Sequence, residues 1–286
     1  MRKKRRRKVD YKMKRKIRIG CSLVMITVLL LTLLSGCKKK TEDDKVITFA
    51  AANLKLYEDT TKVLAQEVEK LGYKLDYKFL SDNTELNEAV ENGDAFANYH
   101  QHTAYLKEFN KSKGTHLVAA FEAFTDRAGI FSKKYKNIKD LPDGANISIP
   151  VDTGNNFRTF AMLSDAGLIK LKDGVDIASV TQKDIVDNPH KYTFTEVDYT
   201  MLSRAIEDAD AGFLYATVAA EIGLDYNKDS LLKESEKLQS TDIIAVREEN
   251  KDSEKVKILK QAYQSDAMKK ALLDAYQGEE ILLPAW

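Results

Sequence analysis

Short apolar runs alternate with longer amphipathic segments along most of the chain, from residue 46 to residue 276. The almost entirely apolar run 46–52 predicts a buried strand. Residues 57–71, with apolar side chains at helical spacing, predict a helix that ends at Gly72. Further strands are predicted at 74–80 and 95–99, and further helices at 85–91 and 105–111. This strand–helix order predicts an α/β fold with a mostly parallel sheet covered by helices.

The same alternation starts again in the second half of the chain. Strands are predicted at 117–123, 129–132, 146–150, 192–197, 211–215 and 243–246, and helices at 156–165, 201–208, 217–222, 256–263 and 266–276. Two such units predict two lobes, which we place at residues 46–124 plus 241–286 and at residues 125–240. The chain then passes between the lobes twice, and clefts between lobes are common ligand sites. The sequence therefore predicts a two-lobed α/β fold with a central ligand cleft.

The N-terminal residues 1–19 contain twelve Lys or Arg and one acidic residue, and an apolar run from Cys21 to Leu34 follows them. A basic segment before a short apolar core is typical of an export signal. This core is shorter than the ~20 apolar residues that span a bilayer. A single-pass anchor and a basic patch that binds nucleic acid are the alternatives for this region.

The apolar core ends in Leu-Ser-Gly-Cys at residues 34–37, which resembles a bacterial lipobox. In that motif the cysteine receives a diacylglycerol, and the chain is cut just before it. The resemblance predicts a signal peptide over residues 1–36, lipidation at Cys37 and a lipidated tether over residues 37–45. The protein is then expected at the extracytoplasmic face of the cell membrane, held by its lipid anchor.

The part of the chain that follows the signal is acidic. Removing the twelve basic residues and the one acidic residue of positions 1–19 from the 45 and 44 of the whole chain leaves 33 and 43, a net charge near −10. Such a charge argues against a nucleic-acid partner. The only cysteines are Cys21 and Cys37, so the body after the tether is predicted to have no disulfide and no cysteine-bound metal.

Several stretches of the body match a known family in their order and spacing. They lie at residues 93–98 (Gly-Asp-Ala-Phe-Ala-Asn), 101–106, 131–134, 138–144, 167–174, 187–189, 247–252, 261–266 and 284–286. On these residues the chain resembles the methionine-binding lipoprotein family (NlpA/MetQ), the substrate-binding components of ABC importers. The resemblance implies a periplasmic-binding-protein fold of type II, whose two lobes close on the ligand about a hinge. It also implies an amino-acid ligand, an ABC permease with its ATPase subunit as partner, a monomer, no cofactor and no enzymatic activity.

Arg158 is the predicted contact for the carboxylate of an amino-acid ligand. Arginine binds a carboxylate through two parallel N–H groups. Arg158 also lies close to the start of the predicted helix 156–165, where backbone N–H groups attract anions. The resemblance implies the same role, with Asn155 beside it. A surface arginine on a solvated helix is the alternative.

A cluster of polar and aromatic side chains begins at Tyr99 and continues through His100, Gln101 and His102 to Tyr105. The resemblance implies that the segment from His100 to Tyr105 forms part of the cleft wall. A zinc site usually takes three or four ligands, and no further histidine pair lies close in the sequence, so no metal is predicted. A hydrogen-bonded loop packed against the core is the remaining alternative.

Several positions that line the pocket in relatives depart from the family pattern. They are Asn83, His100, Arg127, Thr217 (with Tyr215 nearby) and the turn 53–55 after the first strand. Polar side chains thereby replace aromatic and apolar ones, whereas a thioether favours apolar and aromatic walls. Arg127 and His100 suggest a ligand with a more polar or acidic side chain, or a dipeptide.

The sequence as a whole predicts a lipid-anchored solute-binding protein that captures methionine or a related amino acid and delivers it to a permease. The same scaffold with a more polar amino acid or a dipeptide as ligand is the first alternative, and a surface adhesin is the second. An enzyme is disfavoured because the chain lacks a Gly-x-Ser-x-Gly elbow, a His-Glu-x-x-His helix and a glycine-rich phosphate loop.

Overall fold

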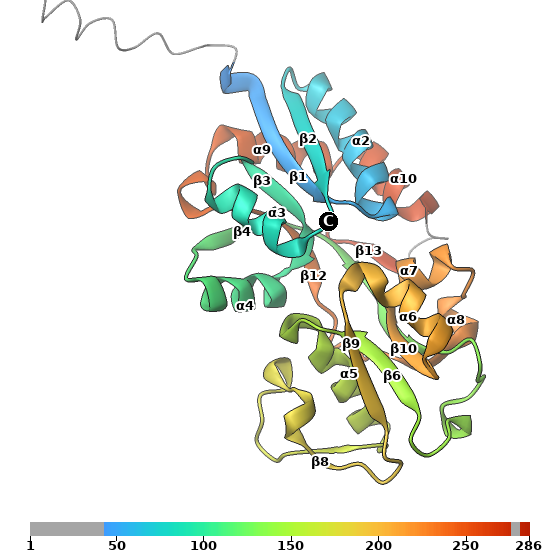
Figure 1. Cartoon of the computed structure of the whole chain (residues 1–286). Coiled ribbons are helices and arrows are strands. Elements are labelled where there is room, and N and C mark those ends of the chain that lie inside the picture. Colours follow the sequence, from blue (N-terminus) through green and yellow to red (C-terminus); the bar gives the residue numbers. More distant parts are fainter. Residues whose placement is uncertain (1–42, 276–280) are drawn as a thin grey trace, which may run out of the picture. The chain divides into compact units, whose positions relative to one another are not determined.

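The computed structural model describes residues 43–275 and 281–286, and nearly all of these belong to the compact unit Lys45–Trp286 (Figure 1). The predicted signal peptide, the predicted lipidation site Cys37 and all but the end of the tether lie outside the described residues. Within the described residues, no helix is long and apolar enough to cross a membrane.

The first sheet has six strands in the order β13-β4-β12-β3-β1-β2. They are β1 (Val46–Ala52), β2 (Lys74–Leu80), β3 (Ala97–His102), β4 (Leu117–Asp126), β12 (Thr241–Arg247) and β13 (Leu282–Pro284). Strand β1 runs parallel to β2 and β3, whereas β12 runs antiparallel to β3 and β4. The predicted parallel arrangement therefore holds for the first three strands, and the strand that returns from the second half of the chain runs the opposite way.

The second sheet has five strands in the order β11-β5-β10-β6-β9. They are β5 (Ala128–Phe131), β6 (Asn146–Pro150), β9 (Thr193–Val197), β10 (Ala211–Tyr215) and β11 (Ser230–Lys233), and a separate two-stranded ribbon pairs β7 (Lys170–Leu171) with β8 (Ile185–Asp187). Strand β6 runs parallel to β9 and β10, and β5 runs antiparallel to β10 and β11. The sequence analysis missed β7, β8, β11 and β13, because strands of two to four residues are too short to show an alternation.

Helices flank both sheets. Those of the first sheet are α2 (Lys55–Lys70), α3 (Asn83–Glu91), α4 (Thr103–Lys113), α9 (Glu254–Tyr263) and α10 (Asp266–Ala275). Those near the second are α5 (Thr153–Asp165), α6 (Leu202–Asp208), α7 (Ala216–Glu221) and α8 (Tyr226–Asp229). Single 3₁₀ turns are η1 (Asp43–Lys45), η2 (Ile138–Asp140), η3 (Ile177–Ser179), η4 (Gln182–Asp184), η5 (Tyr199–Met201) and η6 (Glu248–Asn250). Helix α5 starts at Thr153 rather than at the predicted residue 156, so Arg158 lies in its second turn.

Helix α2 illustrates how the local sequence builds the first sheet's layer. Its buried residues recur at helical spacing and are Leu56, Tyr57, Thr60, Thr61, Leu64 and Val68. Full burial of a Leu or Val side chain contributes roughly 1.5–3 kcal/mol relative to exposure, and Leu64 and Val68 are both completely buried. This packing fixes the helix against β1 and β2 and directs Tyr57, near its start, toward the interior.

The chain crosses between the sheets twice, at neighbouring positions. Strand β4 ends at Asp126 and β5 begins at Ala128, while β11 ends at Lys233 and β12 begins at Thr241. Thr125 pairs with Thr241 across the β4–β12 ladder, and their hydroxyl oxygens are 3.0 Å apart. The residues next to this pair therefore lie where the chain leaves and re-enters the first sheet.

Candidate functional site

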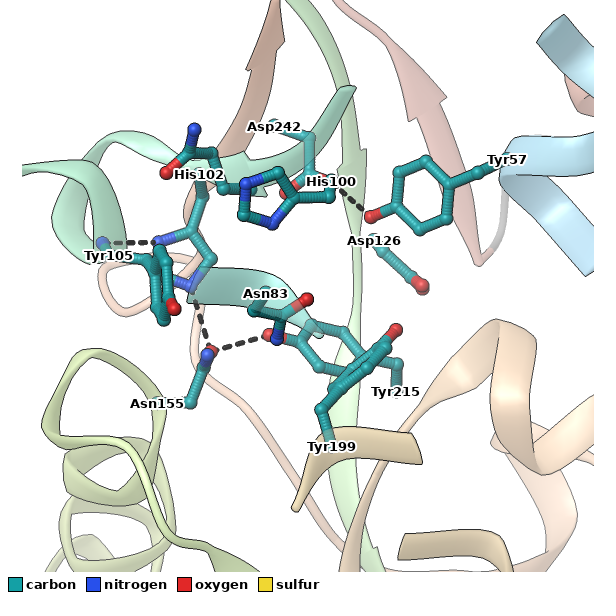
Figure 2. A pocket seen from close by; sticks show the side chains of 11 residues that line it. Tyr57, Asn83, His100, His102, Tyr105, Asp126, Asn155, Tyr199, Tyr215 and Asp242 are labelled. Atoms are coloured by element: carbon teal, nitrogen blue, oxygen red, sulfur yellow. Dashed lines mark hydrogen bonds between the residues drawn. The ribbon is translucent and has the colours of Figure 1, made fainter. Parts of the chain in front are cut away.

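A pocket lies between the two sheets, and both contribute to its lining (Figure 2). The first sheet and its helices contribute Tyr57, Asn83, His100, Gln101, His102, Tyr105, Asp126 and Asp242, and the elements of the second contribute Asn155, Tyr199 and Tyr215. The cavity volume is about 20 Å³, which is room for about one water molecule. An amino acid therefore enters only if the two sheets move apart or several side chains rotate.

Strand β3 supplies one wall of the pocket, and all of its residues are buried. The Gln101 amide donates to the side-chain oxygens of Asn87 (2.6 Å) and Asn98 (2.9 Å), which fixes its orientation. His102 Nδ1 accepts a hydrogen bond from the Tyr105 backbone N–H (3.2 Å) and thereby caps helix α4. The predicted wall from His100 to Tyr105 is thus held in place by buried hydrogen bonds.

His102 also connects this wall to the second sheet. Because Nδ1 accepts a hydrogen bond, the proton of the neutral ring is assigned to Nε2, which donates to Asn155 Oδ1 (2.8 Å). Asn155 Oδ1 accepts a second hydrogen bond from the Tyr215 hydroxyl (2.5 Å), and Asn155 Nδ2 donates to Asp152 Oδ1 (2.9 Å). Figure 2 shows the side chains of His102, Asn155 and Tyr215 joined across the pocket.

Both histidines of the wall are uncharged at neutral pH. Burial, and then the neighbouring His102, lowers the pKa of His100 to about 3. Burial, and then the charge of Arg158, lowers the pKa of His102 to about 4. Among the described residues, no group of three His, Cys, Asp or Glu side chains is arranged to hold a metal ion.

Two buried carboxylates, Asp126 and Asp242, line the pocket beside the two chain crossings. They are 5% and 6% exposed, respectively. The Tyr57 hydroxyl donates to Asp242 Oδ2 (2.6 Å), and the Thr217 hydroxyl donates to Asp126 Oδ2. Burial raises the pKa of Asp242 to about 6 and raises the pKa of Asp126 well above its ordinary range.

Arg158 departs from its predicted arrangement. Its Nε donates to Glu234 Oε1 (2.5 Å) and its Nη2 donates to Glu234 Oε2 (2.6 Å), and neither side chain is exposed. The guanidinium carbon lies 4.9 Å from the centre of the Tyr215 ring. Glu234 therefore occupies the two-pronged face that was predicted for a ligand carboxylate. Among the described residues, only Nη1 of this guanidinium has no hydrogen-bond partner.

Arg127 and Thr217 do not line the pocket either. The Arg127 side chain lies near the Tyr226 side chain, and its buried Nε has no partner among the described residues. Its backbone joins the two sheets, because its N–H donates to Ile281 O (3.1 Å) and its C=O accepts from Ala216 N (2.7 Å). Thr217 contacts the pocket indirectly, through Asp126.

The structure brings the other seven residues predicted for the site together in the pocket lining. They are Asn83, His100, Gln101, His102, Tyr105, Asn155 and Tyr215.

Sequence reasoning missed four residues of the lining, Tyr57, Asp126, Tyr199 and Asp242. The two aspartates had a usable signal. Asp242 directly precedes the apolar run 243–246, and Asp126 lies next to the predicted lobe boundary. A charged residue at the end of a strand that enters or leaves a lobe is a good candidate for a cleft residue. The tyrosines had no comparable signal, because buried tyrosines are common in cores.

A larger hollow of about 330 Å³ adjoins the pocket and shares Asn83, Tyr105 and Tyr199 with it. The rest of its lining is Ser81, Asp82, Thr84, Val151, Asp152, Asp198 and Thr200. In the part of the chain that the structure describes, no lysine or arginine lines either hollow. The whole path from the outer hollow to the pocket is therefore acidic and polar.

A sequence model described as NlpA lipoprotein matches residues 47–286. The D-methionine-binding lipoprotein MetQ of Salmonella typhi is 35% identical over 252 residues, which covers 86% of this chain and 91% of that protein.

Solved structures give the same result. A nutrient-binding protein from Burkholderia cenocepacia bound to methionine is 31% identical with a TM-score of 0.77, covering 84% of this chain and 100% of that one. An ABC transporter periplasmic substrate-binding protein from Coxiella burnetii is 29% identical with a TM-score of 0.76, with the same coverage of 84% and 100%. These matches confirm the predicted two-lobed α/β fold of the periplasmic-binding-protein type. The relatives named here are binding proteins, in agreement with the prediction that the chain is not an enzyme.

Proposed function

The chain belongs to the NlpA lipoprotein family, and on this basis we propose that it captures methionine or a related amino acid and delivers it to an ABC importer. One similar protein is named for binding D-methionine, and one similar structure contains methionine. The observation that carries the proposal is the polar pocket whose lining comes from both sheets. Such a lining changes when the lobes separate, which is how a binding protein couples capture to closure.

The second turn and the start of helix α5 are the proposed site for the ligand carboxylate. Asn155 lies in the first turn of the helix, where backbone N–H groups and the helix dipole favour an anion. Arg158 Nη1 has no partner among the described residues and is the part of the guanidinium still able to donate. Arg158 thus contributes its Nη1 group and its charge, while Glu234 accepts from Nε and Nη2.

The remaining lining residues are proposed to contact the ammonium group and the side chain of the ligand. We assign this role to the predicted residues Asn83, His100, Gln101, His102, Tyr105 and Tyr215, and to Tyr57, Asp126, Tyr199 and Asp242. Arg127 and Thr217 support the pocket without lining it. Thr217 orients the Asp126 carboxyl group, and the Arg127 backbone joins the two sheets.

Opening of the cleft is a necessary part of the proposed cycle. The pocket volume of about 20 Å³ is far below that of an amino acid. We place the moving lobes at residues 46–124 plus 241–286 and at residues 125–240, with the hinge at the paired threonines Thr125 and Thr241. Ligand contacts to both lobes would then favour the closed arrangement.

The proposed setting is the extracytoplasmic face of the cell membrane. Lipidation at Cys37 would anchor the chain there, and residues 37–45 would tether the folded body. A monomer in this position can meet the permease of an importer, whose ATPase subunit supplies the energy. Nucleic acid is not a proposed partner, since the body carries a net charge near −10, with 33 basic and 43 acidic residues after position 19.

A thermal-shift screen tests the proposed function. The unacylated body, residues 41–286, is heated with each of the twenty amino acids and with a set of dipeptides. A true ligand at a hundred times its dissociation constant adds ~2.7 kcal/mol of stability, so its unfolding midpoint rises clearly. If no amino acid raises the midpoint, the proposed function is wrong.

A matched pair of variants shows that a shift comes from the pocket. Asn155→Ala removes the amide that bridges the two sheets and is expected to abolish the shift. Asn92→Ala changes a residue that ends helix α3 and lines neither hollow, so its shift should match that of the unchanged protein. The midpoints without ligand show whether both variants are folded.

A further inference from the structure

The pocket has an unusual composition for a site that would bind a thioether. Its lining contains no aliphatic side chain and, within the described residues, no lysine or arginine. It offers tyrosine rings and hydroxyls, side-chain amides, two neutral histidines and two carboxylates. Asp126 and Asp242 are the only acidic residues of this described lining.

Among the described residues, no lysine or arginine forms an ion pair with either carboxyl group. The charge of Arg158 acts on both from a distance and lowers their pKa values, but the effect of burial is larger. Asp242 receives one hydrogen bond, from the Tyr57 hydroxyl, and no described group donates to its Oδ1. Asp126 receives the Thr217 hydroxyl and a long contact of 3.4 Å from the Thr217 backbone N–H. Two buried carboxyl groups that face one pocket thus lack the direct ion-pair partner that buried charges normally have.

The titration of the two groups agrees with this geometry. Burial raises the pKa of both carboxyl groups, and the charge of Asp242 contributes to the raised pKa of Asp126. A buried carboxylate is stabilised by a bound cation, since an opposite charge within a few ångströms favours its charged form. A ligand with two positive groups would satisfy both sites at once.

We propose that the ligand is an amino acid with a cationic side chain, such as lysine, ornithine or arginine, whose two positive groups are bound by Asp126 and Asp242. The proposal rests on the proposed amino-acid-binding function. The α-ammonium group of any amino acid needs one carboxylate, and the second is then available to the side chain. The expectation of an acidic side chain is corrected, because Arg127 lies outside the lining and His100 is neutral.

The approach to the pocket carries the same sign of charge. Asp82, Asp152 and Asp198 line the outer hollow. Asp82 caps helix α3 and Asp152 accepts from Asn155, so these two also stabilise local structure. A cleft lined by one sign of charge raises the local concentration of oppositely charged solutes. The outer hollow therefore favours the entry of cations.

The aromatic part of the lining suits a long cationic side chain. Tyr57, Tyr105, Tyr199 and Tyr215 all contribute, and the rings of Tyr199 and Tyr215 meet edge to face with centroids 5.2 Å apart. A tyrosine face attracts an ammonium or guanidinium group. The same rings pack against the methylene groups of a lysine or arginine, whose stem is apolar.

Two matched pairs of ligands test the proposal. Norleucine has the side-chain length of lysine without its ammonium group, and citrulline is a neutral analogue of arginine. Each is titrated calorimetrically into the body, residues 41–286, which contains the compact unit Lys45–Trp286. We expect lysine or arginine to bind ~10- to 100-fold more tightly than its neutral analogue, as for a hydrogen bond between charged groups.

The variants Asp242→Asn and Asp126→Asn keep the size of each side chain and remove its charge. In at least one of them the preference for the cationic ligand should fall to less than ~3-fold, because the side-chain cation loses its carboxylate. Asp173→Asn, at an exposed turn residue, is the matched control and should leave the preference unchanged. Unfolding curves without ligand establish that each variant is folded.

The outcomes separate this inference from the function on which it rests. If methionine, norleucine or citrulline binds as tightly as the cationic ligands, the inference is overturned and the amino-acid-binding function stands. If the preference survives in both aspartate variants, the assignment to these carboxylates is overturned. If no amino acid binds the unchanged protein at all, the proposed function itself fails.

Discussion

Two pairs of buried ionisable side chains lie close together in this fold, and they differ in whether the fold supplies an ion-pair partner. Beside the pocket, Arg158 and Glu234 meet through two short hydrogen bonds of 2.5 and 2.6 Å. In the pocket, Asp126 and Asp242 are similarly buried but receive only hydroxyl groups and one backbone N–H from the described residues. The first group balances its own charge, whereas the second brings together two carboxyl groups that have no direct ion-pair partner.

The difference teaches that the degree of burial does not separate a structural charge from a binding charge. All four side chains are almost completely buried. A carboxylate whose counter-charge belongs to the fold stabilises the fold, and one without it is free to select a ligand. The family resemblance, together with the affinity of arginine for carboxylates, favoured Arg158 as the ligand contact. In the structure its Nε and Nη2 groups donate to Glu234 instead.

The largest effect on stability is expected from removing the charge of Glu234 in the Arg158–Glu234 pair. Glu234→Gln keeps the shape of the side chain and leaves the Arg158 charge buried without its partner. Loss of one member of a buried pair typically costs ~3–5 kcal/mol, so the free energy of unfolding in urea should fall by about that amount. Glu236→Gln, at an exposed residue in the same loop, should change it by less than ~0.5 kcal/mol. A loss below ~1 kcal/mol for Glu234→Gln would mean that the pair is not a structural unit.

Removing the charge of Asp242 is expected to have the opposite effect and to stabilise the ligand-free protein. Burial raises the folded-state pKa of Asp242 from 3.8 to about 6. A raised carboxyl pKa contributes stability that is fully present below pH 3.8 and is lost as the pH rises through about 6. Asn cannot ionise, so Asp242→Asn should be more stable by roughly 1–3 kcal/mol near neutral pH, with the gain vanishing near pH 4.

Urea unfolding of the ligand-free protein at about pH 4, 6 and 7.5 measures this dependence on pH, and Asp173→Asn is the control. An equal or lower stability of Asp242→Asn at the highest pH would contradict the comparison. It would indicate that the ionised Asp242 has a counter-charge within the fold.

A smaller effect concerns ligand binding. A cationic ligand binds best when the pocket carboxyl groups are ionised, and burial raises the pKa of Asp242 to about 6 and that of Asp126 well above its ordinary range. The affinity for the cationic ligand should therefore rise by ~10-fold between pH 5 and pH 7. His100 and His102 have pKa values of about 3 and about 4 and stay neutral in this range. Calorimetric titrations should give a flatter profile for the neutral analogue, and equal slopes would speak against charge recognition.

The sequence predicted the parts of this molecule that depend on local patterns. Apolar runs and helical spacing are local, so the α/β order and most element positions were predicted. The segment from His100 to Tyr105 stood out as a local cluster of polar and aromatic residues, and the family resemblance implied its place in the cleft wall. The pairing of β4 with β12 joins residues that are 116 positions apart, Thr125 and Thr241, and no local pattern carries it. For the same reason Glu234, 76 positions from Arg158, was missed.

The smallest effect tests a side chain that contacts both regions. The Tyr215 ring lies 4.9 Å from the Arg158 guanidinium carbon, and its hydroxyl donates to Asn155 Oδ1 (2.5 Å) in the pocket. Tyr215→Phe keeps the ring and removes the hydroxyl, and Asn155 Oδ1 retains its hydrogen bond from His102. A single neutral hydrogen bond is worth ~0.5–1.5 kcal/mol, so the free energy of unfolding should fall by about that much.

Tyr77→Phe, at a tyrosine that is 38% exposed, is the matched control for this substitution and should cost less than ~0.5 kcal/mol. A loss above ~3 kcal/mol for Tyr215→Phe would show that the hydroxyl stabilises the buried charges themselves. The two regions would then form one network, and the contrast between a structural pair and a binding pair would no longer hold. A loss in the expected range leaves Tyr215 as a neutral side chain between two independent groups of charges.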